Sequence, residues 1–346
     1  MAVATAALVG MASVLLPSAP AEAQSVSFDR SEFGRIVLAR KQSTGGRVDE
    51  ELEVAIENYS NESVSKYADT TRFRVLGRSV GRLDVLTDAG TFPCTAFLVS
   101  DRHLVTNHHC VDGMVGRVKG VTRIEALNFV TGYFTEGLRE GAASFSVSPR
   151  PVEADEALDY AVLEVFGSPS RDWGALKLVS ADIKPGLPFW IIGHPMGEAQ
   201  RISREGCASS SPALDGRARL RHTCDTLPGN SGSPVIDTDT GRVVALHNSG
   251  SKRNSINFAI PMRAILEHSR TLRDLAAGEV TAPTPRPPAP GPSDPSETAS
   301  ADCTQARADY DRAAGENTAS AYRAHLDRFG TCPYAAVARD LLKASE

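Results

Sequence analysis

The feature that most restricts the fold is an alternation of short apolar segments with turns, which begins at Val80 and continues to Ile260. Short segments rich in β-branched and aromatic residues, bounded by glycine, proline and polar residues, are typical of strands. We therefore predict an all-β domain. The predicted strands are Val80–Thr87, Ala96–Ser100, His103–Asn107, Ile124–Val130, Ser144–Val147 and Tyr160–Val165 in the first half, and Phe189–Gly193, Arg201–Arg204, Arg217–His222, Pro234–Asp237, Val243–His247 and Ile256–Ile260 in the second.

One turn in the second half, Gly229-Asn230-Ser231-Gly232-Ser233-Pro234, places a serine between two glycines. The glycines allow backbone conformations that side chains forbid, and they keep Cβ atoms away from an approaching carbonyl group. The backbone N–H groups of Gly229 and Ser231 can then point at one position, where they would stabilise an oxyanion. Ser-Gly turns are common, however, so the turn alone does not identify a catalytic serine.

Two further residues complete a pattern. A serine hydroxyl is a poor nucleophile near neutral pH unless a base takes its proton and a third group orients that base. His109 follows the apolar segment that ends at Asn107, and Asp159 directly precedes the segment that begins at Tyr160. The chain order His, Asp, Ser is one of the orders in which such triads occur. His109, Asp159 and Ser231 are therefore the candidate catalytic residues.

With these motifs, residues from about Val80 to Ala276 resemble a trypsin-like serine protease. Asn230 and Ser233 make the serine turn more similar to the bacterial glutamyl-endopeptidase branch than to the digestive enzymes. The resemblance implies two six-stranded antiparallel β-barrels, an active site in the cleft between them, and a C-terminal helix on the second barrel.

The resemblance also implies a role for each residue. His109 corresponds to the general base, Asp159 to its orienting carboxylate and Ser231 to the nucleophile, with an oxyanion hole formed by the N–H groups of Gly229 and Ser231. The implied reaction requires neither a metal ion nor an organic cofactor.

Two assignments of the substrate pocket stay open. Asp225 lies six residues before Ser231, where trypsin-like enzymes that cut after Arg or Lys carry an acid. Glutamyl endopeptidases instead bind the substrate carboxylate with a threonine five residues before the serine and a histidine on a later strand, and Thr226 and His247 resemble these. Histidine can hydrogen-bond an acid in either protonation state. We favour an acidic or small polar P1 residue, and His247 as a packing residue is the alternative.

The six cysteines form three close pairs along the chain. Six cysteines allow fifteen pairings, and the sequence alone cannot choose among them, although sequential closure is favoured. The resemblance implies a bridge beside His109. A zinc site at His108, His109 and Cys110 is a weaker interpretation, because adjacent residues cannot easily converge on one ion. The pairs are Cys94 with Cys110, Cys207 with Cys224, and Cys303 with Cys332.

The N-terminal end resembles a secretory signal peptide. Residues 1–23 contain a short apolar run and end in Ala21-Glu22-Ala23, a small-x-small cleavage pattern, although no Lys or Arg precedes the run. Export agrees with paired cysteines, so we predict a secreted or periplasmic protein. Residues 24–79 are predicted to be an N-terminal extension or propeptide that includes an amphipathic helix over 48–59. Packing of this extension on the first barrel is favoured.

Because Asn230 carries no charge, we expect no activation in which a freed N-terminus forms an ion pair with an acid just before the nucleophile.

The C-terminal part divides into three predicted units. Pro261 starts a helix that ends before Gly278 and closes the protease-like domain, residues 80–278. Residues 279–301 are rich in proline and predict an extended linker. Residues 302–346 predict a small helical domain, with helices at 303–312, 318–329 and 333–343, stapled by a disulfide. It resembles a single helical repeat and is a candidate for binding a protein or cell-envelope partner.

The net charge of −5 and the scattered basic residues indicate no nucleic-acid-binding surface. We therefore interpret the chain as a secreted serine endopeptidase that acts on proteins or peptides. The alternative is a catalytically idle protease fold that serves as a binding module, and an esterase activity is a weaker option.

Overall fold

The computed structural model describes residues 26–38, 59–251, 254–278, 305–306, 309–310, 312–313, 318–330, 335, 338–339 and 342. The predicted signal peptide, most of the predicted helix over 48–59, the proline-rich linker and the pair Cys303 and Cys332 lie outside these residues.

The first half of the chain forms an antiparallel sheet that closes into a barrel. Its strand order is β6-β5-β2-β3-β4-β8-β7. Closure comes from the N–H of Ser148, which donates to the carbonyl of Glu164 at 2.8 Å, and from the N–H of Phe166, which donates to Ser146 at 3.0 Å. The strands are β2 (Val80–Thr87), β3 (Gly90–Leu98), β4 (His103–Thr106), β5 (Ile124–Thr131), β6 (Ala143–Val147), β7 (Glu153–Asp155) and β8 (Tyr160–Glu164).

The second half forms a second antiparallel sheet, in the order β1-β10-β9-β13-β14-β15-β12-β11. The N–H of Phe189 donates to Cys207 at 2.9 Å and that of Ser209 donates to Leu187 at 2.9 Å, which joins the start of β9 to β11 and closes this barrel. The strands are β1 (Glu62–Ser63), β9 (Phe189–Gly193), β10 (Arg201–Ser203), β11 (Ser209–Leu214), β12 (Leu220–His222), β13 (Pro234–Asp237), β14 (Val243–Ser251) and β15 (Ile256–Pro261).

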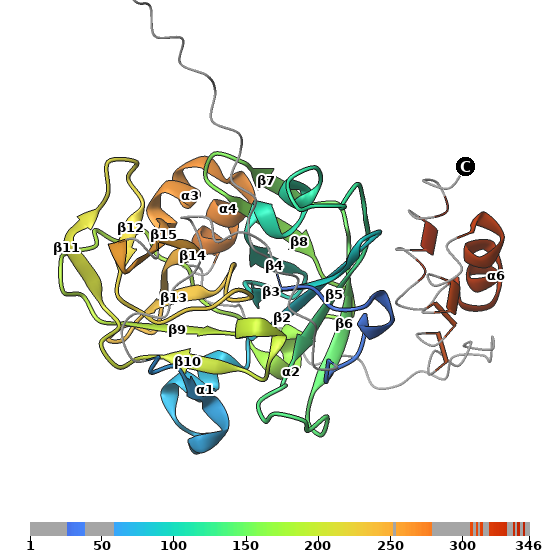
Figure 1. The fold of residues 1–346 in the computed structure, drawn as a ribbon, viewed down its shortest axis with the longest axis horizontal. Helices are drawn as coiled ribbons and strands as arrows, with labels where there is room; N and C mark the ends of the chain where they lie inside the picture. The colour runs from blue at the N-terminus through green and yellow to red at the C-terminus, as the bar shows by residue number, and fades with distance from the viewer. Residues whose placement is uncertain are drawn as a thin grey trace, which may run out of the picture.

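The predicted pair of six-stranded antiparallel barrels is confirmed within the described residues. Six strands close each barrel; β7 extends the first sheet, and β1 and β10 extend the second. Figure 1 shows the barrels side by side, with β2 to β8 in one half of the picture and β9 to β15 in the other.

Three strands were missed by the sequence analysis, and the strand over 217–222 was predicted too long. β1 is only two residues long and lies in the segment before the barrels. β7 is only three residues long, and β11 contains three serines and Pro212, so neither has the apolar alternation of a typical strand. The predicted strand over 217–222 begins only at Leu220. The residues before it form a turn in which Asp215 Oδ1 accepts hydrogen bonds from the N–H groups of Arg217 and Arg219, both at 2.9 Å.

The helices are short and lie on the surface of the barrels. The predicted helix after Pro261 is two helices, because the hydroxyl of Ser269 accepts a hydrogen bond from the N–H of Leu272 at 3.0 Å and caps a new helix. The helices are α1 (Arg72–Gly77), α2 (Ser170–Trp173), α3 (Met262–His268), α4 (Arg270–Gly278) and α6 (Ala319–Phe329), with 3-10 helices η1 (Arg30–Glu32), η2 (Val64–Lys66), η3 (His108–Cys110), η4 (Asp112–Met114) and η5 (Pro195–Gly197).

Each barrel has its own apolar core, and a third cluster joins them. This shared cluster contains Phe97 and Val162 from the first barrel, Ile192 and Leu246 from the second, and Ile265 from α3. Burial of apolar side chains contributed by both sheets holds the barrels at one relative position, so a site built across their junction is preorganised.

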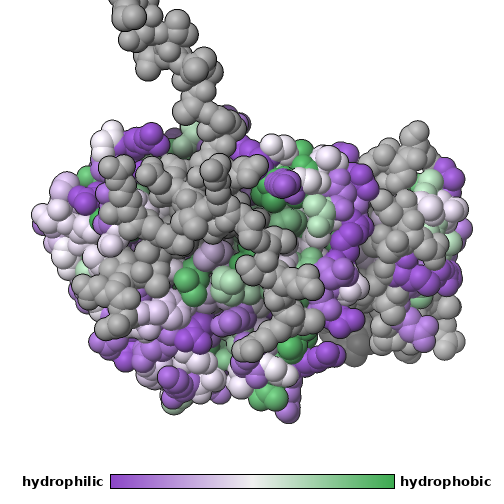
Figure 2. Space-filling model, viewed as in Figure 1, coloured by the Kyte–Doolittle hydropathy of each residue, from purple (hydrophilic) through white to green (hydrophobic). Residues whose placement is uncertain are grey.

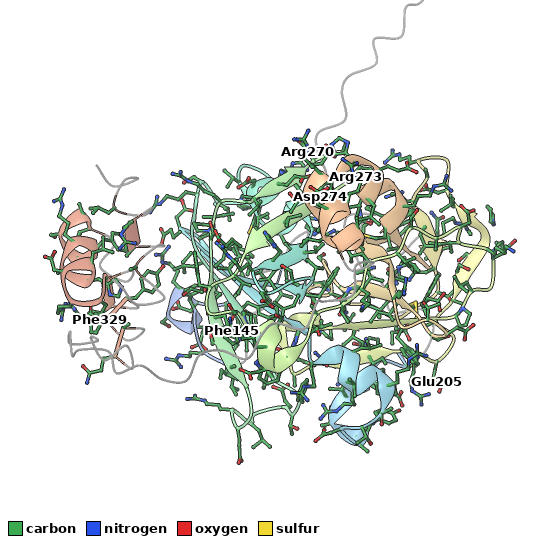
Figure 3. All side chains as sticks on the ribbon, turned by 180° about the vertical axis from the view of Figure 1, so that it is seen from behind. Phe145, Glu205, Arg270, Arg273, Asp274 and Phe329 are labelled. Atoms are coloured by element: carbon green, nitrogen blue, oxygen red, sulfur yellow. A yellow bond between two sulfur atoms is a disulfide. The ribbon has the colours of Figure 1, made fainter. Side chains whose placement is uncertain are left out.

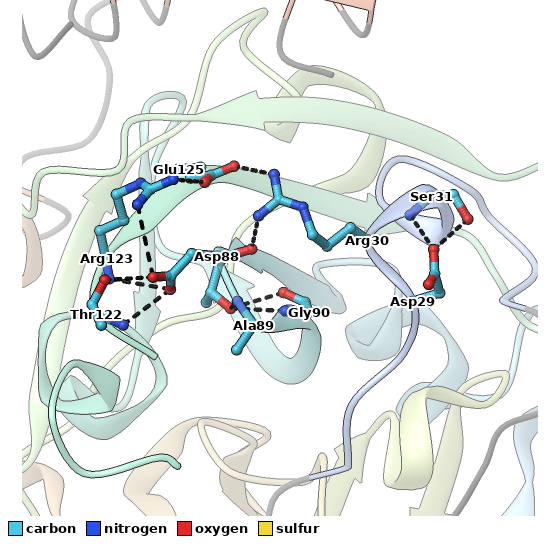
Figure 4. A network of polar contacts seen from close by, with 10 residues as sticks. Asp29, Arg30, Ser31, Asp88, Ala89, Gly90, Thr122, Arg123 and Glu125 are labelled. Atoms are coloured by element: carbon cyan, nitrogen blue, oxygen red, sulfur yellow. Dashed lines mark hydrogen bonds and ion pairs between the residues drawn. The ribbon is translucent and has the colours of Figure 1, made fainter. Parts of the chain in front are cut away.

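The segment 26–38 packs against the first barrel through polar contacts. Arg30 bonds to Glu125 and to the carbonyl of Thr87, and Arg123 bonds to the other oxygen of Glu125 at 2.9 Å (Figure 4). Asp88 in the same network accepts a hydrogen bond from Thr122, which lowers the pKa of Asp88 to about 2. The network connects the N-terminal segment to the β2–β3 turn and to β5.

The fully buried Arg82 is the second anchor of this segment. Its guanidinium bonds to Asp84 at 2.6 and 3.0 Å, and to the carbonyls of Arg35, Ile36 and Gly197 at 2.7 to 3.0 Å. Both side chains of the Arg82–Asp84 pair are completely excluded from solvent. One arginine therefore joins the first barrel, the N-terminal segment and the loop after β9.

The C-terminal unit has a small apolar cluster of Tyr310, Ala313, Ala321, Tyr322 and Ala338, against which Phe166 from the first barrel packs. In Figure 1 α6 lies beside the barrel edge formed by β5 and β6, and Figure 3 places Phe329 on the same side of the molecule as Phe145.

On the coloured part of the face in Figure 2, apolar residues form small patches among polar ones. Among the described residues, no helix has the length and apolar character that crossing a membrane requires.

Replacing Arg82 tests this anchor. We expect Arg82→Met to lower the free energy of unfolding by about 3–5 kcal/mol, because it leaves Asp84 buried without its arginine. Arg82→Met/Asp84→Leu removes both charges and should recover part of that loss. Chemical unfolding measures both values, and a double variant less stable than the single one would contradict the prediction.

Candidate active site

His109 and Asp159 meet at the edge of the first barrel. His109 lies in η3, which follows β4, and Asp159 lies in the turn that leads into β8. His109 Nδ1 is 2.8 Å from Asp159 Oδ2, and the backbone N–H of His109 donates to Asp159 Oδ1 at 3.0 Å. Because both carboxylate oxygens engage the same residue, the imidazole is held with Nδ1 toward the acid and Nε2 on its opposite side.

Asp159 is held in an unfavourable backbone conformation. Its φ is +45°, in the left-handed region that residues other than glycine rarely adopt. Two asparagines support it: Asn107 Nδ2 donates to its carbonyl at 2.9 Å, and Asn248 Nδ2 lies 3.4 Å from Oδ2. Such strain persists only where surrounding contacts determine the conformation, and it is typical of functional sites. Asn248 belongs to β14, so the second barrel also contacts this acid.

The two asparagines were not among the residues singled out from the sequence. Asn107 lies two residues before His109, and Asn248 follows His247 directly. Their positions beside candidate residues are the only sequence signal that could have indicated them.

Ser231 is brought to the same place by its backbone. Its carbonyl accepts a hydrogen bond from the N–H of Thr95 on β3 at 2.8 Å, and the Sγ of Cys110 lies 3.8 Å from that carbonyl. Cys110 follows His109 directly and is joined to Cys94 by a disulfide. The serine turn and the histidine are thus both attached to β3, at the position of this disulfide.

The serine turn requires its two glycines. Gly229 has a φ of +103°, and a Cβ there would lie 2.6 Å from the carbonyl oxygen of His194. Gly232 has a φ of +86°, and a Cβ there would lie 2.1 Å from the carbonyl oxygen of Thr95. No larger residue fits either position, as the sequence pattern indicated. The N–H groups of Asn230, Gly232 and Ser233 are bonded within the fold.

A second set of contacts fixes the turn from the side of β9. Thr95 Oγ1 donates to the carbonyl of Gly229 at 2.8 Å and accepts from the N–H of His194 at 3.0 Å. The N–H of Met196 donates to the carbonyl of Pro228 at 2.6 Å. His194 itself is buried against Tyr133, and burial lowers its pKa to about 3. His194 is therefore a neutral residue with a structural role.

The two pocket assignments are distinguished by what Asp225 contacts. Only 4% of Asp225 is exposed, and its Oδ2 accepts hydrogen bonds from both the N–H and the hydroxyl of Ser60, each at 2.8 Å. Its backbone N–H donates a hydrogen bond to the hydroxyl oxygen of Ser203 at 2.8 Å. The carboxylate that the trypsin-like assignment needs is thus bonded to Ser60, a residue that precedes the barrels in the chain.

Thr226 and His247 are both completely buried. In the part of the chain that the structure describes, the hydroxyl of Thr226 has no hydrogen-bond partner. His247 Nδ1 lies 3.2 Å from Nε2 of His222, the last residue of β12. Burial, and then the neighbouring His247, hold the pKa of His222 well below its usual range. His222 is therefore neutral and orients the ring of His247.

The remaining candidates have simple positions. Cys207 and Cys224 form a disulfide between β11 and the end of β12, directly before Asp225. Within the described ranges no group of three or more His, Cys, Asp or Glu side chains could hold a metal ion.

Parts of the chain are similar in sequence to known proteins. Residues 94–246 match the family model of the trypsin-like peptidase domain. The chain is 30% identical over 211 residues to secreted RxLR effector protein 73 of Plasmopara viticola, covering 59% of this chain and 52% of that protein. It is 26% identical over 228 residues to an extracellular metalloprotease of Bacillus subtilis, covering 62% and 71%.

Among solved structures, a Glu endopeptidase in complex with MPD is similar, with a TM-score of 0.46 and 17% identity over 67% of this chain and 97% of that one. In the sequence comparison, the chain spans about half the length of secreted RxLR effector protein 73.

The neutral His222 predicts how stability depends on pH. Its pKa is lower in the folded than in the unfolded chain, so below pH 6.5 the unfolded chain binds a proton that the folded chain does not. Its contribution to the free energy of unfolding is fully present above pH 6.5 and falls as the pH falls, by up to about 1.4 kcal/mol per unit. Unfolding with urea between pH 6.5 and 5 measures this slope. We expect His222→Gln to reduce this slope by the amount that corresponds to one proton, up to about 1.4 kcal/mol per pH unit. An unchanged slope would contradict the assignment of His222 as neutral in the folded chain.

Proposed function

We propose that this chain, whose residues 94–246 form a trypsin-like peptidase domain, is a serine endopeptidase with His109, Asp159 and Ser231 as its catalytic residues. The observation that carries the proposal is the double contact of the Asp159 carboxylate with His109, beside a serine turn attached to the same strand.

In the proposed reaction, the Oγ of Ser231 attacks the carbonyl carbon of a peptide bond while its proton passes to Nε2 of His109. Asp159 accepts the Nδ1–H and stabilises the imidazolium that forms. The electron pair of the carbonyl moves onto its oxygen, which the N–H groups of Gly229 and Ser231 stabilise. Breaking of the C–N bond gives the proton of His109 to the leaving amine. Water then repeats these steps on the acyl-enzyme and regenerates Ser231.

We propose an acidic P1 residue for the substrate. A carboxylate needs donors, and the hydroxyl of Thr226 and the imidazole of His247 are both present close to the serine turn. The carbonyl of His247 accepts a hydrogen bond from the N–H of Gly232, next to the nucleophile, at 3.0 Å. The competing acid, Asp225, has its Oδ2 engaged by Ser60, which supports the glutamyl-endopeptidase-like assignment of the pocket.

The arrangement of the chain belongs to the same proposal. We propose a signal peptide over 1–23, an N-terminal extension over 24–79, a peptidase domain over 80–278, a linker over 279–301 and a helical domain over 302–346. The packing of residues 26–38 and 59–64 on the barrels supports an extension that is part of the mature fold. Two disulfides support a secreted or periplasmic protein.

The triad is tested by active-site labelling. We expect a fluorophosphonate probe to label the wild-type chain, and Ser231→Ala to abolish labelling. Ser231→Ala and His109→Ala should each lower kcat on a peptide substrate by roughly 10⁴ to 10⁶. A chain that binds peptides but neither labels nor cleaves would instead be a binding module.

The pocket is tested with a peptide library. We expect cleavage after Glu or Asp, and we expect Thr226→Val to lower kcat/KM for these peptides by about tenfold, because it removes one hydrogen bond to a charged group. Thr240→Val, the same substitution in an exposed turn, is the matched control. Cleavage after Arg or Lys by the wild-type chain would contradict the acidic assignment.

A further inference from the structure

Asp225 contacts residues 59–64, which precede the barrels, and this contact suggests that these residues control the substrate pocket. We name residues 59–64 the strap. Two donors of Ser60 bond to one oxygen of the Asp225 carboxylate at 2.8 Å, and Nδ2 of Asn61 donates to the carbonyl of the same residue at 3.2 Å. The strap thus holds both the side chain and the backbone of Asp225, from 165 residues away along the chain.

The strap is itself firmly attached to the second barrel. Its strand β1 pairs with β10, and the N–H of Val64 donates to the carbonyl of Gln200 at 3.2 Å. The side chain of Val64 is completely buried in the cluster shared by the two barrels. Arg201 on β10 donates a hydrogen bond to the carbonyl of Asn61. Ser60 is therefore a donor on a fixed support.

Asp225 lies in the loop that leads to the proposed nucleophile, three residues after the end of β12. Its neighbour Cys224 is fixed by the disulfide to Cys207 and by a hydrogen bond to its carbonyl from Asn257 at 2.8 Å. Thr226 follows directly. The backbone of Asp225 is therefore fixed by its neighbour Cys224, by Ser203 and by Asn61, and rotation of the side chain decides where the carboxylate lies.

The direction of this carboxylate matters for an acidic substrate. A carboxylate in a pocket repels an acidic P1 side chain and attracts a basic one, and such repulsion is a common source of specificity. With its carboxylate bonded to the strap, Asp225 does not compete with Thr226 and His247 for the role of recognising P1.

We propose that Ser60 is a specificity-determining residue of this peptidase: by bonding the carboxylate of Asp225 to the strap, it keeps that acid out of the pocket that receives P1. The inference rests on the function proposed above. Ser60 acts through Asp225 and is a positioning residue. Loss of its hydroxyl removes one of the two Ser60 donors to Oδ2 of Asp225 and so weakens the contact that turns the carboxylate away from the pocket.

The experiment compares Ser60→Ala, Ser60→Thr and wild type on peptides that differ only at P1, Glu or Lys. We expect Ser60→Ala to lower kcat/KM for the Glu peptide by about tenfold and to raise it for the Lys peptide, because one hydrogen bond to a charged group is lost. Ser60→Thr keeps a hydroxyl and should keep the wild-type ratio. In Ser60→Ala/Asp225→Asn the gain on the Lys peptide should disappear.

Ser63→Ala is the matched control, since the hydroxyl of Ser63 bonds only to Ser65 at the surface among the described residues. It should leave the Glu-to-Lys ratio unchanged. Should the alanine variant fail to fold, as judged by circular dichroism, Ser60→Gly removes the same hydroxyl.

Labelling with a fluorophosphonate, which carries no P1 side chain, separates the two proposals. A wild-type chain that does not label overturns the proposed function and this inference with it. A chain that labels and cleaves, but whose Glu-to-Lys ratio is the same in wild type and Ser60→Ala, overturns the inference alone. A gain on the Lys peptide that persists without the carboxylate of Asp225 also overturns it.

Discussion

The carboxylate of Asp159 is the contact on which the candidate site depends. It bonds to the ring and to the backbone of His109, and it lies within reach of Asn248 on the other barrel. The left-handed backbone of Asp159 is an unfavourable conformation, and Asn107 stabilises it by bonding to its carbonyl. A single acid therefore orients the imidazole and contacts residues of both barrels.

Local sequence was sufficient for most strands and for the glycines of the serine turn, whereas the arrangement of the strands in two barrels was inferred from the family resemblance. Most strands were predicted because they are short apolar segments bounded by turn residues, which is a local property. Several of them, such as β2 and β3, are buried along their whole length. The glycines at 229 and 232 were predicted because the turn brings its backbone against other backbone, where a Cβ has no room. In contrast, the split of the helix at Ser269 depends on one hydroxyl that caps the second helix, a competition that composition alone does not reveal.

The supporting residues of the site could not be predicted in the same way. Asn248 and His222 act on residues that lie 89 and 25 positions away in the chain. Nothing in their own sequence neighbourhood distinguishes an asparagine that contacts the carboxylate of Asp159 from one that faces solvent. Their roles follow only from the closure of the second barrel, which brings β12, β14 and the edge of the first barrel together.

The two pocket assignments show this limit most clearly. Counting back from Ser231 makes Asp225 a credible floor of a pocket for basic side chains, and counting one residue less makes Thr226 a credible donor for acidic ones. Both counts are correct, and local sequence offers no reason to prefer either. The contacts of Ser60 distinguish the two residues in the structure, because a buried carboxylate must find donors and the strap supplies two of them. Under the role proposed above for Ser60, specificity depends on a segment that precedes the barrels, so a chain with the same pocket residues and another strap would select a different substrate.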